Sequence, residues 1–290
     1  MLVPSFEMHV AKSVEDAIKL RSEFGDDSSF YAGGTELLLV MKLGLTDLAH
    51  LIDIKHVEEL SSISIDESGV RIGAAVTYRE IENNPILKSD HPEFVQMISG
   101  VANLRVRSVG TLGGNLAFAD PASDPATFLL AVKGELEIGS VNGKRRLVPM
   151  AGFQTGPYQP DLAENEMIVS IRLPRNLAGG IVVHERMKLK ERPNITVAVF
   201  AAVANGKVTE ARVAIGSIGL VPICIPEVNK SLEGASRATL SERLRQAAEI
   251  ASTEITLFDD ANGSVDYKRH LVKHFVEKVA RRAIEAVLLN

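Results

Sequence analysis

The chain has 290 residues, 46% of them hydrophobic and 24% charged, with a formal net charge of -5 at pH 7. A chain of this length and composition folds into two or three globular domains and needs no disulfide to stabilise a core. The mixed, slightly acidic charge disfavours a nucleic-acid partner, and the single cysteine, Cys224, excludes an intrachain disulfide, a four-cysteine zinc site and an iron–sulfur cluster ligated by this chain alone.

The first 54 residues alternate between strand and helix patterns. Ser13 and Asp16 have the spacing of a helix N-cap pair, and Thr35 is placed to cap a second, apolar helix that ends at Gly44. Three strands joined through helices require parallel pairing with right-handed crossovers. The predicted elements are a strand at 7–10, a helix at 14–24, a strand at 30–32, a helix at 36–43 and a strand at 48–54.

The next region is predicted to be mostly antiparallel. Thr77 and Glu80 form a capping box that starts a short helix, and Asn142-Gly143 between two apolar runs is a strong hairpin signal. The run from Pro174 to Asn176 followed by Gly179-Gly180 is the best candidate for a domain boundary. The predicted elements here are strands at 63–65 and 70–76, a helix at 92–102, strands at 135–138 and 145–148, and a strand at 167–173.

The C-terminal part reads as a separate α+β domain of about 110 residues. Asn205-Gly206 joins two of its strands in a hairpin. A three-stranded antiparallel sheet with helices on one face is the economical arrangement. The predicted elements are strands at 181–190, 196–204 and 208–215, and helices at 241–252 and 266–289.

Two glycine pairs are the candidates for ligand binding. Ala32-Gly33-Gly34-Thr35-Glu36 lies between a strand and a helix, where glycines admit close backbone approach and a helix start suits a phosphate. Thr111-Leu112-Gly113-Gly114-Asn115 could form a second cradle of N–H donors, and Asp124 could accept hydrogen bonds from ribose or ribityl hydroxyls. Each glycine pair alone is more often only a tight turn, but two together could clamp the two phosphates of a dinucleotide.

Other kinds of site find little support in the sequence. His270 and His274 stand four residues apart on a predicted helix without the zinc-protease motif, so they read as ordinary helix histidines. The chain has no Rossmann glycine motif, P-loop or nucleophile elbow. We therefore predict no catalytic residue and no metal ligand in this chain.

Two segments carry a resemblance to a known family. YAGGTELLLVMKLG and, about 80 residues later, TLGGNLAFADPASD resemble the FAD-binding medium subunits of the molybdenum hydroxylases, the family of carbon monoxide dehydrogenase and xanthine dehydrogenase. The resemblance extends over essentially the whole chain: ENEMIVSIRLP resembles the end of the flavin domain, and MKLKERPNITVAVFAAV resembles the start of the family's C-terminal domain.

The resemblance implies an FAD-binding fold of the type found in p-cresol methylhydroxylase and vanillyl-alcohol oxidase. On this basis residues 1–176 form the FAD-binding domain, with subdomains at about 1–56 and 57–176. Residues 177–290 form a C-terminal domain of the carbon monoxide dehydrogenase flavoprotein type. The implied fold class is α+β with an α/β N-terminal part.

The resemblance also implies which residues contact the flavin. Val101 stands where xanthine dehydrogenase has an aromatic residue, Asp124 corresponds to the acidic contact to the polyol chain, Ile168 to an apolar contact, and Lys188 to a basic contact near the ring. The chain around Lys188 is one residue shorter than in relatives, so Lys190 is a possible substitute. The implied loop contacts are Phe30, Tyr31, Ala32, Gly33, Gly34, Thr35, Glu36 and Leu37 in the first loop, and Thr111, Leu112, Gly113, Gly114 and Asn115 in the second.

As a family member, the chain would carry FAD and transfer electrons within a complex of three components. A small subunit would hold two [2Fe–2S] clusters and a large subunit the molybdopterin cofactor, and two such three-subunit units would form a heterohexamer. The N-terminal sequence lacks a signal-peptide pattern and no apolar run spans a bilayer, so we expect a cytoplasmic protein. Two alternatives remain open: a stand-alone flavin reductase on the same fold and a non-catalytic assembly scaffold.

Overall fold

The computed structural model describes residues 3–175 and 179–288, and these divide into two compact units. The first unit consists of the described residues up to Ala119, together with Glu135–Phe153 and Gln159–Leu173. The second consists of Asp120–Gly134, Gln154–Tyr158 and the described residues from Pro174 onward. The chain therefore leaves the first unit after Ala119 and returns to it at Glu135.

The strands and helices follow one another in mixed order along the chain. The strands are β1 (Glu7–Val10), β2 (Ser28–Tyr31), β3 (His50–Asp53), β4 (Ile63–Asp66), β5 (Gly69–Gly73), β6 (Glu135–Gly139), β7 (Arg145–Pro149), β8 (Gln154–Gly156), β9 (Gln159–Pro160), β10 (Met167–Pro174), β11 (Ile181–Met187), β12 (Ile195–Ala204), β13 (Lys207–Gly216) and β14 (Ile223–Cys224). The α-helices are α1 (Val14–Phe24), α2 (Leu37–Lys42), α3 (Tyr78–Asn83), α4 (Pro85–Asp90), α5 (Pro92–Ser99), α6 (Leu104–Arg107), α7 (Leu112–Phe118), α8 (Asp124–Val132), α9 (Pro226–Leu232), α10 (Leu240–Glu254) and α11 (Val265–Leu288).

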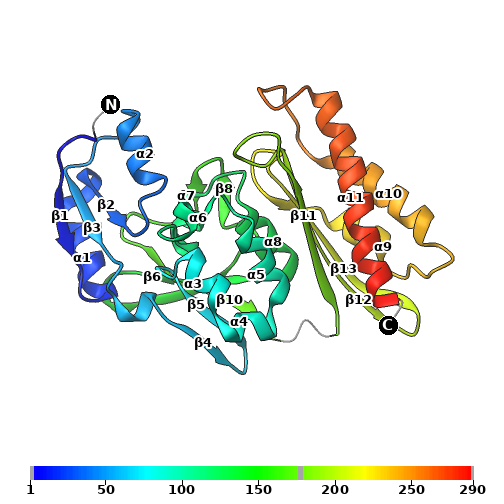
Figure 1. Ribbon diagram of the computed structural model, residues 1–290, viewed down its shortest axis with the longest axis horizontal. Helices are drawn as coiled ribbons and strands as arrows, with labels where there is room; N and C mark the ends of the chain where they lie inside the picture. The colour runs from blue at the N-terminus through cyan, green and yellow to red at the C-terminus, as the bar shows by residue number, and fades with distance from the viewer. Residues whose placement is uncertain (1–2, 176–178, 289–290) are drawn as a thin grey trace. The chain divides into compact units, whose positions relative to one another are not determined.

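The first sheet has the order β1-β3-β2, and both neighbouring pairs are parallel, as the sequence predicts. Helix α1 connects β1 to β2 and packs against β2 and β3, and its first turn is capped by the Ser13 hydroxyl, which accepts from the Asp16 N–H (Figure 1). The predicted cap at Thr35 is wrong. Helix α2 begins at Leu37, and its N-cap residue is Glu36, which makes no side-chain capping hydrogen bond. The residues from Ala32 to Glu36 are therefore free to form a loop at the carboxyl edge of the sheet.

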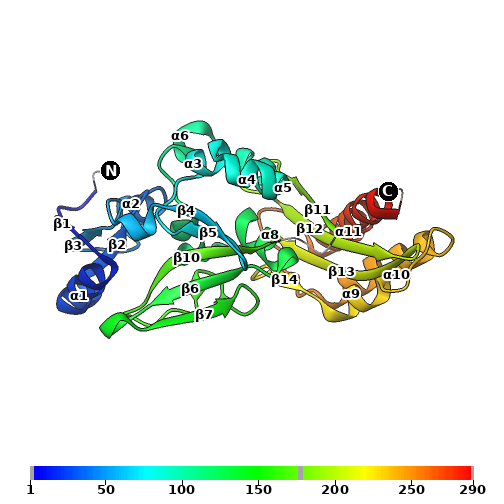
Figure 2. The same cartoon turned by 90° about the horizontal axis from the view of Figure 1, so that it is seen from below.

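The second sheet of the first unit has five strands in the order β4-β5-β10-β6-β7 (Figure 2). The predicted hairpin at Asn142-Gly143 joins β6 to β7, where both residues have positive φ. The predicted capping box is also present, since the Thr77 hydroxyl accepts from the Glu80 N–H while the Glu80 carboxylate accepts from the Thr77 N–H. Both features depend on residues close in sequence, which is why the sequence reveals them.

The second unit is built on a four-stranded antiparallel sheet, β11-β12-β13-β14. The predicted three-stranded sheet is therefore one strand short, because the two-residue strand β14 is too brief to give an alternating pattern. Helices α9, α10 and α11 lie on one side of this sheet (Figure 1). Alternate residues of β12, such as Val197 and Val199, pack in one core with these helices. Residues of the opposite face, such as Thr196, lie against α8.

Helix α8 corrects the expectation of a sheet covered on one face only. All nine residues of α8 are buried, and the helix contacts β12 and β13. Strand β12 is buried almost along its whole length, as expected when both faces of a sheet are covered. No local pattern indicates that residues 124–132 pack with β12 and β13, which follow much later in the chain.

Two sequence predictions fall partly outside the described residues. The domain boundary at residue 176 lies in the range 176–178, and the predicted end of the last helix at residue 289 lies beyond the described part of α11. Among the helices of the described ranges, none combines the length and the apolar character needed to cross a membrane.

Candidate functional site

A cavity of about 290 Å³ lies within the first unit, where the loop after β2 meets the segment that leads into α7. This volume is close to the lower end of the range for sites that take organic ligands. Both predicted glycine loops contribute to its wall. The lining residues are Ser29, Phe30, Ala32, Gly33, Gly34, Thr35, Glu36, Leu37, Ile54, Ala74, Tyr78, Val101, Ala102, Val106, Gly110, Thr111, Gly113, Gly114, Asn115, Ala117, Phe118, Leu162, Glu166, Met167 and Ile168.

The first glycine loop follows β2 and offers main-chain donors at the cavity. Within residues 3–175 and 179–288, the N–H groups of Gly33, Gly34 and Thr35 donate no hydrogen bond to another part of the chain. Gly34 has a φ of +65°, a left-handed conformation that glycine adopts without strain. Consecutive unpaired N–H groups in such a turn suit an anion, so this loop fits a phosphate group.

In the second glycine loop, the main-chain N–H groups of residues 112–115 all donate hydrogen bonds within the chain. The N–H groups of Leu112 and Gly113 donate to the carbonyls of Val76 and Ala74 at 3.1 and 3.0 Å. The Gly114 N–H donates to the Thr111 hydroxyl at 3.1 Å, which caps α7. We therefore correct the prediction of a second cradle of free N–H groups: this loop forms a wall of the cavity and holds α7 in place.

Glycine is required in both loops because each packs against backbone. A Cβ at Gly33 would lie 2.1 Å from the Val109 carbonyl oxygen, and one at Gly113 would lie 2.6 Å from the Ala74 carbonyl oxygen. Such distances are shorter than any non-bonded contact, so a side chain at either position would push two segments apart. The sequence predicts that these glycines allow a ligand to come close to the backbone. At Gly33 and Gly113, the neighbour that comes close is another segment of the chain.

The remaining wall is mostly apolar, with one ionised group. Val101 and Ile168 contribute to it, and Ile168 is the second residue of β10 and is 4% exposed. Glu166 also lines the cavity, and Arg146 donates to its two oxygens at 2.9 and 2.7 Å. The hydrogen bonds from Arg146 lower the pKa of Glu166 despite partial burial, so this carboxylate is ionised at neutral pH.

Two of the predicted loop contacts support the cavity from behind its surface. Leu112, the first residue of α7, is completely buried. The Tyr31 ring lies beneath the first loop, where a Cβ at Gly34 would be 2.5 Å from the ring, and the Lys55 ammonium lies 4.8 Å from the ring centroid. These two residues shape the loops, while the other predicted loop residues form the lining itself.

Asp124 belongs to the second unit and is not among the lining residues of the cavity. Its carboxylate accepts a 2.5 Å bond from the Arg186 guanidinium and a 2.8 Å bond from the Thr196 hydroxyl, and the His184 ring lies 3.8 Å away. Burial by itself would raise the pKa of Asp124, but these three neighbours outweigh it and lower the pKa below its ordinary value. Asp124 is therefore an ionised, buried group that stabilises the second unit.

The two candidate lysines also lie in the second unit, in the loop that follows β11. Lys188 and Lys190 are exposed. The loop is closed by Asn194, whose main-chain N–H donates to Met187 and whose side-chain oxygen accepts from the Leu189 N–H. Neither lysine lines the cavity of the first unit, and the choice between them as a flavin contact stays a prediction.

Sequence reasoning missed several lining residues, among them Tyr78, Phe118 and Glu166. Tyr78 begins the helix of the predicted capping box, and Glu166 stands two residues before the predicted contact at Ile168. The only sequence signal for these residues was that they lie close in sequence to a predicted contact or capping box. Their convergence on one cavity depends on tertiary packing.

Comparison with known proteins agrees with this arrangement. The family described as FAD binding domain in molybdopterin dehydrogenase matches residues 4–176, more than half of the chain. The chain belongs to this family. A second family, the CO dehydrogenase flavoprotein C-terminal domain, matches residues 191–283. The fold class implied by the resemblance is confirmed, because an FAD-binding domain is followed by a C-terminal domain in a mixed helix and sheet fold.

Individual relatives cover almost the full length. The carbon monoxide dehydrogenase medium chain of Hydrogenophaga pseudoflava is 30% identical over 98% of this chain and 98% of its own length. The nicotine 6-hydroxylase medium subunit of Paenarthrobacter nicotinovorans is 30% identical over 99% of each chain. A solved structure of the Hydrogenophaga pseudoflava carbon monoxide dehydrogenase lacking the Mo-pyranopterin moiety matches with a TM-score of 0.93 and 31% identity, over 99% of each chain.

Proposed function

We propose that this chain is the FAD-carrying, electron-transferring subunit of a three-component molybdenum hydroxylase. Family membership supports FAD binding, and relatives that match from end to end are medium chains of such enzymes. The observation that carries the proposal is the cavity of the first unit, where an anion-binding loop lies beside an apolar wall. FAD combines these two properties, because it has a charged diphosphate and a flat, largely apolar ring.

The first loop would bind the diphosphate. The N–H groups of Gly33, Gly34 and Thr35 would donate to its oxygens, since they have no partner within the described part of the chain. Glu36 is unsuited to the same oxygens because of its charge, so the main chain is the source of binding energy here.

The apolar wall would hold the rest of the cofactor and exclude water. Val101 and Ile168 offer aliphatic surface, and Asn115 offers an amide that can both donate and accept. Bound FAD supplies the ability to take up and release electrons one or two at a time. The chain itself would bind and orient it, and we assign no residue as a nucleophile or general base.

Asp124 and Lys188 remain predicted contacts of the polyol chain and the ring. The supporting observation for Asp124 is that it is ionised, so its oxygens are strong acceptors, although Arg186 and Thr196 already donate to them. For Lys188 the support is its exposed side chain. A lysine beside the ring would favour reduction, because the reduced ring carries negative charge.

The complex would include a small subunit with two [2Fe–2S] clusters and a large subunit with the molybdopterin cofactor, arranged as a heterohexamer of two three-subunit units in the cytoplasm. Electrons would reach the FAD from the clusters and leave to an external acceptor. This division of labour is supported by the single cysteine of the chain, which is insufficient for a cysteine-ligated cluster.

The first experiment is the visible absorption spectrum of the purified chain after incubation with FAD and removal of the excess. We expect one bound flavin per chain. The electron-transfer step is tested by adding the FAD-loaded chain to a complex of the small and large subunits and measuring flavin reduction after substrate is supplied. Reduction by NAD(P)H with the isolated chain at a comparable rate would favour a stand-alone reductase, and a folded chain that binds no FAD even with its partners would favour a scaffold.

A further inference from the structure

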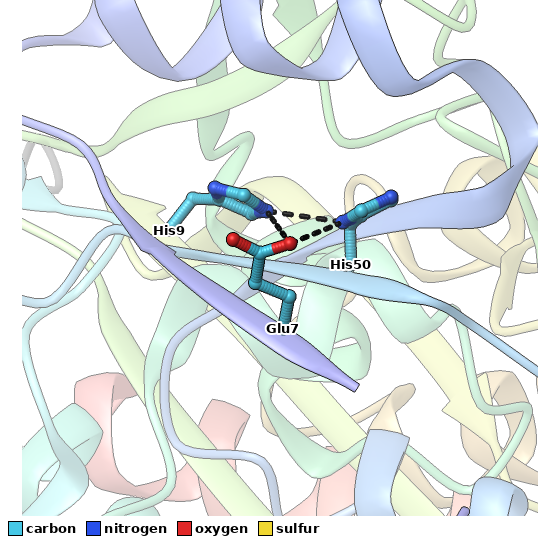
Figure 3. Close-up of side chains that lie close together, drawn as sticks. All are labelled: Glu7, His9 and His50. Atoms are coloured by element: carbon cyan, nitrogen blue, oxygen red, sulfur yellow. Dashed lines mark hydrogen bonds and ion pairs between the residues drawn. The ribbon is translucent and has the colours of Figure 1, made fainter. Parts of the chain in front are cut away.

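A cluster of two histidines and a glutamate lies on the first sheet, away from the flavin cavity. Glu7 and His9 are on β1, and His50 begins β3 opposite Glu7. Because side chains alternate along a strand, Glu7 and His9 point to the same face, and the parallel register places His50 beside them. Figure 3 shows the three side chains converging.

We propose that Glu7, His9 and His50 form a binding site for one divalent first-row transition-metal ion such as Zn²⁺. Imidazole nitrogen and carboxylate oxygen are the ligand atoms that zinc takes alongside thiolate, and two histidines with one glutamate form a known type of zinc ligand set. Among the described residues, this is the one group of three His, Cys, Asp or Glu side chains whose ligand atoms all lie within 4.8 Å of one another.

The distances between the three ligand atoms fit one ion. His9 Nε2 lies 3.0 Å from His50 Nδ1, and Glu7 Oε2 lies 4.0 Å from the first nitrogen and 3.8 Å from the second. A triangle with sides of 3.0, 3.8 and 4.0 Å has a circumscribed circle with a radius of about 2.1 Å, which equals the usual zinc–nitrogen and zinc–oxygen bond lengths. One point therefore lies at bonding distance from all three atoms.

The two imidazoles are packed against a neighbouring ring, and the glutamate is exposed. The Phe24 ring at the end of α1 stacks on both, with centroids 4.4 Å from His9 and 4.1 Å from His50. The histidine side chains are 17% and 25% exposed, whereas that of Glu7 is 70% exposed. The two packed imidazoles would thus receive the ion, and the exposed Glu7 carboxylate would complete the set, leaving room for water as a further ligand.

A simpler explanation is a hydrogen bond between the two rings. At 3.0 Å one neutral imidazole donates to the other, and such a bond contributes about 1 kcal/mol. Metal binding replaces this bond, because both facing nitrogens must then be unprotonated. The two arrangements need the same side-chain positions, so metal titration distinguishes them.

The site is separate from the proposed flavin loop. The amino edge of the sheet contains His50, which is paired in register with Glu7 on one side and Ser28 on the other. The glycine loop follows Tyr31 at the opposite, carboxyl edge. Three residue steps along a strand separate the edges by about 10 Å. An ion at the amino edge would fasten β1, the edge strand, to β3.

The test is a Zn²⁺ titration of the full-length, tag-free chain, loaded with FAD and freed of metal by chelation, in competition with a coloured zinc chelator. We expect one ion per chain, and affinity at least about tenfold weaker in His9→Gln, His50→Gln and Glu7→Gln, which each lose one ligand. The matched control is His270→Ala/His274→Ala, because those exposed histidines lie four residues apart on α11 and could also bind zinc.

The control variant should bind zinc as the parent chain does. Loss of binding in the control, or unchanged affinity in the His9, His50 and Glu7 variants, would overturn the proposal, as would no binding at micromolar Zn²⁺. Glu7→Gln keeps the test decisive if the histidine variants unfold, because Glu7 is exposed and its replacement preserves the fold. Zinc should also raise the unfolding temperature of the parent chain and not that of Glu7→Gln to the same degree.

Discussion

The two glycine loops of the first unit each contain a Gly-Gly pair, but they have different structural roles. In the loop from Ala32 to Glu36, three consecutive N–H groups have no partner in the described chain, so the loop can bind an anion. In the loop from Thr111 to Asn115, the corresponding groups are bound to the backbone at 74 and 76 and to the Thr111 hydroxyl. A glycine pair thus indicates that something packs closely against the backbone. The hydrogen bonds of the loop show whether its N–H groups are available to a ligand or are already used within the chain.

The largest expected effect tests whether the glycines serve packing. Gly33→Ala and Gly113→Ala should each lower the free energy of unfolding by about 3 kcal/mol or more, because the new Cβ would overlap backbone atoms. The measurement is chemical denaturation without FAD. Gly44→Ala is the matched control: it has a φ of +71° but open space around it, so it should cost about 1 kcal/mol. Equal losses at all three positions would contradict the packing explanation.

The next effect concerns a predicted flavin contact outside both loops. Asp124→Asn should cost about 2 to 3 kcal/mol of stability at pH 7, because it leaves the partly buried Arg186 without its anionic partner. The folded-state pKa of Asp124 is lowered, so its stabilising effect is present above the unfolded pKa near about 4 and is lost as the pH falls through the folded value.

The difference between the wild type and Asp124→Asn should therefore be present at pH 7 and shrink below about pH 4. Denaturation at several pH values measures it. A variant with unchanged stability and greatly weakened FAD binding would instead place Asp124 among the cofactor contacts.

A third prediction separates the two loops by charge. Thr35→Glu should bind FAD at least about tenfold more weakly than Thr35→Gln, which has the same shape without charge, because a carboxylate beside unpaired N–H groups would repel the diphosphate. Asn115→Asp should weaken binding less, since the N–H groups of residues 112–115 in the second loop already donate within the chain. Equilibrium titration followed by flavin fluorescence gives the affinities, and an equal or larger effect at Asn115 would remove the distinction between the loops.

The smallest expected effect tests whether the second loop stabilises the start of α7. Thr111→Val removes the hydroxyl that accepts from the Gly114 N–H and should destabilise the chain by about 1 kcal/mol. Thr111→Ser retains the acceptor and should recover most of this loss. Thermal or chemical denaturation of the two variants provides the comparison, and equal stabilities would show that the cap contributes nothing measurable.

The sequence predicted the elements whose determinants are local. The N-cap of α1 at Ser13, the capping box at Thr77 and the hairpin at Asn142-Gly143 all depend on residues within a few positions, and all are present. The motif positions of the first loop also proved to line the cavity. The domain boundary at residue 176 and the individual flavin contacts stay predictions.

The features that were missed or wrong depend on contacts distant in sequence. The second loop loses its N–H groups to Ala74 and Val76, which no local pattern reveals. His9 and His50 are 41 residues apart and meet only because β1 and β3 pair in parallel with one particular register. Such juxtapositions are determined by topology, which a single sequence expresses weakly.

Helix α8 has a consequence for how this protein can be divided. Its nine buried residues come from the middle of the sequence, yet they cover one face of the sheet formed by β11 to β14. A gene fragment beginning at residue 177 would encode that sheet with its residues Thr196, Ala198 and Phe200 uncovered. The C-terminal unit therefore cannot be separated intact by a single cut in the chain. A fusion protein that is to contain this unit must also include residues 120–134.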